Sequence, residues 1–134
     1  MAERLSVFVQ EPKRGEIVVF SIAHIPQIVA NGMSPNEVFI QRLAGLPGDH
    51  LRIENEQLLV NGKVPDELKD FRYTTVTFPG SLDLNAGVTV PEGHCFMLGD
   101  NSKNSYDSRY WGYVPKEDIK GVYFAHYWRN PGSF

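Results

Sequence analysis

Apolar and polar residues alternate along short runs of this chain, and glycine or proline separates one run from the next. The runs are rich in valine, isoleucine, phenylalanine, tyrosine and threonine, which favour a pleated, half-buried strand. The 12 glycines and 9 prolines mark turns between them. We expect strands at residues 5–9, 16–22, 38–44, 50–54, 57–60, 71–78, 94–98 and 119–127. The pattern therefore predicts a mainly β fold of antiparallel sheets with little helix.

Two neighbouring runs predict a hairpin. Leu51 and Ile53 precede a polar Glu-Asn-Glu segment, and Leu58 and Val60 follow it. An Asn-Gly pair at residues 61–62 supplies a second turn, where a positive φ costs little. No internal repeat or shift in composition divides the chain, so we expect one domain over residues 1–134.

The composition and charge of the chain argue against several classes of function. The chain has 134 residues, a net charge of -3 and no basic patch, which argues against a nucleic-acid partner. Cys95 has no second cysteine to pair with, and we expect it to be a small buried apolar residue. The four histidines carry no metal-binding pattern, so we expect neither a metal nor another cofactor. The longest apolar run is far shorter than the ~20 residues that span a bilayer.

Two stretches are hard to explain as ordinary strand and turn. In FIQRLAGLPGDHLRI, residues 39–53, one strand runs into a stiff Gly-Leu-Pro-Gly-Asp corner and leaves as another. In MLGDNSKNSYDSRYWGYVP, residues 97–115, small polar residues lie between an apolar strand and an aromatic cluster. Asp107 and Arg109 are two residues apart, on one side of an extended chain, and we expect them to form an ion pair that orders the loop. The alternative is a surface loop rich in Asn and Asp.

Read in order, PKRGEIVVF, FIQRLAGLPGD and GDNSKNSYDSRYWGYVP resemble three of the four conserved blocks of the bacterial type I signal peptidases, which are serine proteases with a Ser/Lys dyad. The resemblance implies a mainly antiparallel β domain on the outer face of the cytoplasmic membrane. It implies an endopeptidase that removes signal peptides from exported proteins, held to the membrane by an anchor that we expect outside this sequence. Aromatic residues in the last third of the chain could contact the membrane surface, although we expect most of them to be core.

The same resemblance exposes two departures. The family's nucleophile lies in a Ser-Met-x-Pro block upstream of RGEIVVF, and no such block occurs in these residues. The family's general base is a lysine before the arginine of the LPGD block, where this chain has Gln41. A serine hydroxyl is a weak nucleophile until a base takes its proton, and a glutamine amide is no base. We therefore expect this chain to be inactive by itself.

The remaining site residues follow from the resemblance. Arg42 would orient the strand, and Ser105, which in the family hydrogen-bonds the lysine, would here meet the side chain of Gln41. The substrate would lie along Val38, Phe39 and Ile40, although Val38 and Ile40 could instead be core. Residues that would form the ion pair and shape the turn beneath the site are Gly99, Asp100, Asn101, Asn104, Asp107, Ser108 and Arg109.

Three functions remain open from the sequence. The chain could be a piece of a working peptidase whose nucleophile lies elsewhere. It could instead be a catalytically dead homologue that binds exported peptides or an active peptidase, for which Gln41 is the main indication. A plain β interaction module is the third reading, and the dense motif match makes it the weakest.

Overall fold

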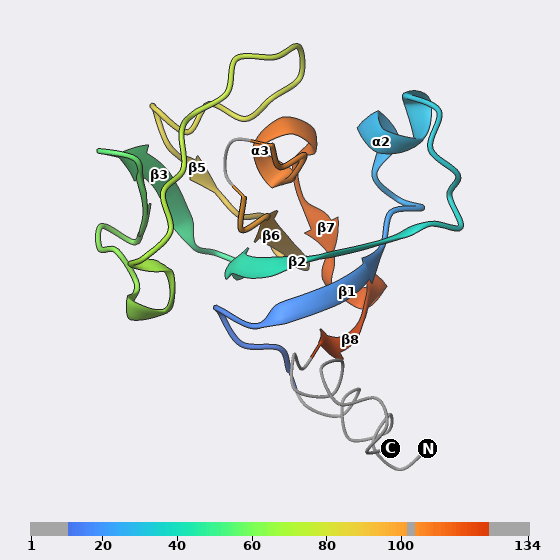
Figure 1. Cartoon of the computed structure of the whole chain (residues 1–134), viewed down its shortest axis with the longest axis horizontal. Helices are drawn as coiled ribbons and strands as arrows, with labels where there is room; N and C mark the ends of the chain where they lie inside the picture. Colours follow the sequence, from blue (N-terminus) through green and yellow to red (C-terminus); the bar gives the residue numbers. More distant parts are fainter. Residues whose placement is uncertain (1–10, 102–103, 124–134) are drawn as a thin grey trace.

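The computed structural model describes residues 11–101 and 104–123, and within them the chain forms two antiparallel sheets (Figure 1). The larger sheet has the strand order β7-β6-β2-β1-β8, and the smaller has the order β4-β3-β5. The strands are β1 (Ile17–Ser21), β2 (Val38–Gly45), β3 (His50–Glu54), β4 (Gln57–Val60), β5 (Val88–Thr89), β6 (His94–Leu98), β7 (Val114–Pro115) and β8 (Ile119–Tyr123). The expected mainly antiparallel β fold is therefore confirmed.

Helices are few and short in the described part of the chain. They are α2 (Pro26–Ala30), α3 (Ser108–Trp111) and the 3-10 turns η1 (Asp66–Leu68) and η2 (Lys116–Asp118). Among the described residues, no helix is long and apolar enough to cross a membrane.

The hairpin expected around residues 51–60 is confirmed. Leu51 pairs with Val60 and Ile53 with Leu58, so the apolar residues of both strands face the same core. The connection turns within two residues, because Asn55 and Glu56 both adopt positive φ angles, 53° and 62°.

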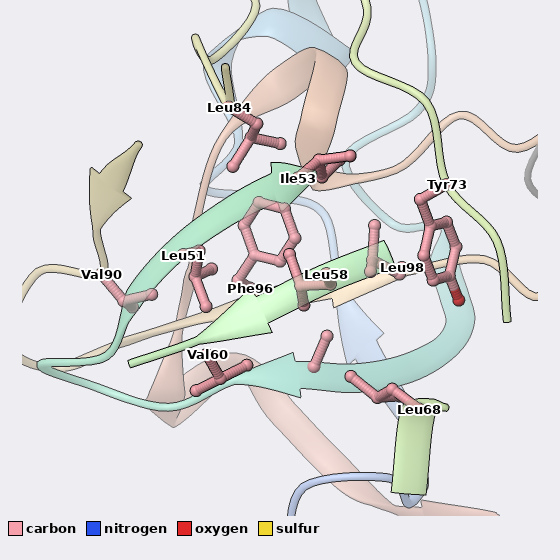
Figure 2. Packing of buried hydrophobic residues seen from close by; sticks show 11 residues of the cluster. Leu51, Ile53, Leu58, Val60, Leu68, Tyr73, Leu84, Val90, Phe96 and Leu98 are labelled. Carbon is pink, nitrogen blue, oxygen red and sulfur yellow. The ribbon is translucent and has the colours of Figure 1, made fainter. Parts of the chain in front are cut away.

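Two clusters of buried side chains lie against the sheets. The first fills the space around the hairpin, with Phe96 of β6 among the leucines and valines of β3 and β4 (Figure 2). The second lies against β1 and β2 and joins Val18, Phe20 and Leu43 to Trp111 of α3. Because β2 is long, its last residues reach the first cluster and its earlier residues contact the second. This strand therefore connects the two parts of the domain.

Several sequence expectations need correction. Residues 71–78 form no strand, because the amide of Tyr73 bonds the carbonyl of Glu56 while the carbonyl of Thr74 is taken by an arginine side chain, and no neighbouring strand continues the ladder. The two-residue strands β5 and β7 were not expected, since two residues carry no alternation. The strand expected at residues 5–9, and the end of the one expected at 119–127, lie outside the described residues.

Candidate functional site

Gln41 lies in the middle of β2, on a stretch of strand that is paired along one edge. Residues Val38 to Arg42 pair with β1, with Gln41 opposite Val18. The pairing of β2 with β6 begins only at Arg42, which lies opposite Leu98. Among the described residues, no strand pairs with the other edge of β2 before Arg42. The main chain of residues 38–41 is thus available for an added strand.

Side chains along this stretch divide between the two faces of the sheet. Val38 and Ile40 are 49% and 52% exposed, so the alternative that they belong to the core is wrong. Phe39 points the opposite way and packs edge-on against Phe20 and Trp111, with ring centroids 6.0 and 6.3 Å apart. The strand therefore presents an apolar outer face while its inner face is anchored in the core.

The side chain of Gln41 bonds the loop above the strand. Its Nε2 donates to the backbone oxygen of Tyr106 over 2.9 Å, and Trp111 Nε1 donates to the same oxygen over 3.1 Å. The Oε1 atom of Gln41 is buried and has no hydrogen-bond partner among the described residues. The bond expected between Gln41 and the hydroxyl of Ser105 is not formed, because that hydroxyl donates to Asp107 instead, over 2.8 Å.

The ion pair expected between Asp107 and Arg109 is confirmed, and it is almost completely buried. Arg109 Nε and Nη2 donate to the two oxygens of Asp107 over 2.9 and 3.0 Å. The two residues do not lie on one extended strand, because Ser108 and Arg109 begin the helix α3. Asp107 caps α3 and accepts from the amide of Arg109, which brings the guanidinium back toward the carboxylate.

The Asp107 carboxylate also bonds Gly99 and Ser105. Besides Ser105, it accepts a bond from the amide of Gly99 over 3.1 Å. A Cβ atom at Gly99 would overlap the side chain of Ser105, so this close approach requires glycine. Ser108 fixes the other side of the loop, because its hydroxyl accepts from the amide of Met97 over 2.8 Å. One buried carboxylate therefore sets the position of Ser105.

Arg42 and Asp100 form the rim of the site. The guanidinium donates two bonds to the carboxylate, over 2.8 and 2.7 Å, and a third to the carbonyl of Gly15. The hydrogen bonds to Asp100 raise the pKa of Arg42 above its already high value. Arg42 also lies over the ring of Phe71 at 4.7 Å from the centroid. These contacts tie β2 to Gly15, Phe71 and Asp100 next to Gln41.

A cavity of about 290 Å³ brings much of this set together. Its lining combines Ile40, Gln41 and Arg42 of β2 with Gly99 and Asp100 of the loop, and adds Ile17 and Tyr123. Sequence reasoning missed these last two, although Ile17 follows the RGE segment and lies opposite both Arg42 and Tyr123 in the sheet. Asn101 and Asn104 form a turn through the Asn104 amide and do not line the cavity.

No described group of three histidine, cysteine or carboxylate side chains could hold a metal ion in this region or elsewhere in residues 11–101 and 104–123. Cys95 is 2% exposed, as the sequence suggested, and lies in the second core cluster.

The chain is similar to known proteins over nearly its whole length. A family model described as signal peptidase, peptidase S26, matches residues 1–128. A probable signal peptidase I-2 of Synechocystis is 38% identical over 129 residues, which cover 96% of this chain and 54% of that protein. Thylakoidal processing peptidase 1 of Arabidopsis thaliana is 37% identical over 129 residues, covering 96% of this chain and 36% of the relative. The chain thus spans about half or less of the length of these relatives.

A solved structure resembles the fold. A signal peptidase I from Enterococcus faecalis aligns with a TM-score of 0.63 and 30% identity, covering 86% of this chain and 98% of that one.

Proposed function

Because the chain belongs to the signal peptidase family, peptidase S26, we propose that it is a peptide-binding domain of the signal peptidase I type in which Gln41 has replaced the general base. It receives the signal peptides of exported proteins as an added strand along residues 38–41 and does not itself cleave them. One observation carries this proposal: Gln41 lies in the wall of the cavity beside the open edge, with its amide bonded to the carbonyl of Tyr106.

The open edge supports the binding half of the proposal. An extended peptide needs unpaired main-chain groups for affinity and shallow pockets for alternate side chains. Residues 38–41 of β2 offer the unpaired main-chain groups, and the cavity beside Ile40 offers a pocket for a side chain. At about 290 Å³ the cavity can receive a side chain near the bond that the relatives would cut.

The chemistry of Gln41 supports the claim that the chain does not cleave the peptides it binds. A serine nucleophile must lose its proton to a neighbouring base before it can attack a carbonyl carbon. The amide nitrogen of Gln41 has no basic lone pair, and its hydrogen is directed at Tyr106. General base catalysis contributes about 100- to 10,000-fold, so its loss alone would leave little turnover.

We place the domain on the outer face of the cytoplasmic membrane, where signal peptides of exported proteins emerge. Its apolar outer strand residues Val38 and Ile40 suit apolar peptides held next to a membrane surface.

A second candidate is a working peptidase that takes its base and nucleophile from residues outside this chain. The hydrogen bonds of Asp107 favour this second candidate, since Asp107 still holds Ser105 and Gly99 as a catalytic loop would require. A binding domain that had lost its chemistry long ago would not need this network for peptide affinity.

The test separates binding from cleavage. The chain is titrated with a synthetic signal-peptide analogue that carries alanine at the cleavage position, and binding and peptide integrity are both recorded. Binding that is weakened by Ile40→Asp, without any fragments, supports the proposal, and Met33→Asp serves as the control because Met33 is also exposed and apolar but lies outside β2. Fragments that appear only when the flanking residues of a longer protein are present, at a rate that Gln41→Ala leaves unchanged, would favour the second candidate.

A further inference from the structure

A second groove lies away from β2, between residues 75–78 and 81–85, and it has a volume of about 540 Å³. The two stretches are joined by a turn at Pro79 and Gly80. The groove shares no lining residue with the cavity at Gln41.

Its first wall is a segment outside the helices and strands that has unpaired main-chain groups. The amides of Thr75, Val76 and Thr77 donate to no protein group, and the carbonyls of Thr75 and Thr77 accept from none, among the residues that the structure describes. All three residue types favour strands. Extended backbone with free donors and acceptors is what an added peptide strand pairs with.

The buried ion pair of Asp107 and Arg109 also contacts both sides of the groove. Arg109 Nη1 donates to the carbonyl of Thr74 over 2.9 Å, and the carbonyl of Arg109 accepts from the amide of Leu82 over 3.1 Å. Each wall is therefore tied to Arg109, which Asp107 fixes from beneath. Ser81 links the walls directly, because its hydroxyl bonds both Phe78 and Val76.

A row of aromatic rings runs from the groove to Tyr106. Phe78, which is 49% exposed, lies 5.9 Å from Tyr110 between ring centroids, and Tyr110 lies 5.6 Å from Tyr106. Tyr106 is the residue whose carbonyl accepts the bond from Gln41. An extended chain advances about 3.3 Å per residue, so about four residues would cross the row.

We propose that the groove is a second peptide subsite, which takes an extended segment of the same polypeptide that binds along β2. The segment pairs with the main chain of residues 75–77 and packs an apolar side chain on Phe78. Asp83 is the only charged residue among the described residues that line the groove, so the preferred segment is uncharged or basic. This inference rests on the proposed peptide-binding function and extends the bound length beyond the β2 edge.

The test uses three synthetic peptides and the whole chain. One of about 8 residues covers the β2 edge, one of about 16 adds an extension rich in threonine, valine and lysine, and the third is the extension alone. The long peptide should bind about tenfold more tightly than the short one. Phe78→Ala, or N-methylation of alternate extension residues, should remove that gain, whereas Met33→Ala should keep it.

The outcomes for the groove and for β2 are distinguishable. Equal affinities of the short and long peptides would overturn the second subsite and leave the β2 proposal standing. If the short peptide does not bind, the β2 proposal fails, and the extension peptide alone then tests the groove. Shifts in the NMR signals of the amides of residues 75–77 on adding that peptide would support the groove. The absence of such shifts would overturn the groove as well.

Discussion

The side-chain nitrogen of Gln41 lies 2.9 Å from the backbone oxygen of Tyr106, where it donates a hydrogen bond that Trp111 reinforces from the other side. This contact joins β2 to the loop that holds Ser105 and Asp107. The resemblance to the signal peptidases implies a lysine base at this position, and here the contact keeps the strand and loop together through a group that cannot accept a proton.

Gln41→Lys should place an amine where the amide of Gln41 now lies, without changing the fold. Since burial disfavours the ammonium, its pKa should lie below the ordinary value of about 10.4. NMR titration of the labelled lysine side chain measures this directly. Gln41→Met is the matched control, because it fills similar volume without a donor and should cost about 1 kcal/mol of stability from the lost bond to Tyr106. An ordinary lysine pKa would show that residue 41 points into water.

Asp107→Asn should be strongly destabilising, because it removes the negative charge of Asp107 from beside the buried guanidinium of Arg109. Breaking one partner of a buried pair costs roughly 3–5 kcal/mol, and the two side chains here are 0% and 1% exposed. Urea unfolding of the variant measures the loss. Glu54→Gln removes an ion pair with Arg52 whose partners are 48% and 40% exposed, and it should change stability by less than about 1 kcal/mol. Similar losses for the two variants would contradict the assigned role of Asp107.

Gly99→Ala should disturb the loop, since the added methyl would overlap the side chain of Ser105. We expect a loss of about 1–3 kcal/mol, typical of an overpacked site. Ser105→Gly in the same chain should recover part of the loss, because it removes the atoms that clash. Thermal unfolding of the two single variants and the double variant measures the coupling, and additive losses would show that the residues are not in contact.

The thiol of Cys95 should react slowly in the folded protein. Burial raises its pKa to about 11 from 9.0, so the neutral thiol is favoured by folding. Its contribution to stability is complete below about pH 9 and is lost as the pH rises through about 11. Alkylation with iodoacetamide at pH 8, followed by mass spectrometry, should be much slower than in urea. Equal rates would place the thiol in solvent.

The sequence predicted those features that depend on residues close together in the chain. Strands β2, β3, β4 and β6 follow from short apolar runs bounded by turn residues, and the ion pair at Asp107 follows from a motif. Residues 71–78 alternate as well, but strand formation needs a partner edge, and the arginine that takes the carbonyl of Thr74 comes from 35 positions later in the chain. The contact between Gln41 and Tyr106 was missed for a similar reason, because a carbonyl carries no sequence signal.

The most direct test of the central claim is one NMR titration of the labelled chain with a signal-peptide analogue, in which the protein amides and the peptide signals are followed in the same sample. The account predicts that amides of residues 38–41 shift as the peptide is added, while the peptide stays intact over a day. Peptide fragments in that sample, or shifts that spare β2 altogether, would contradict it.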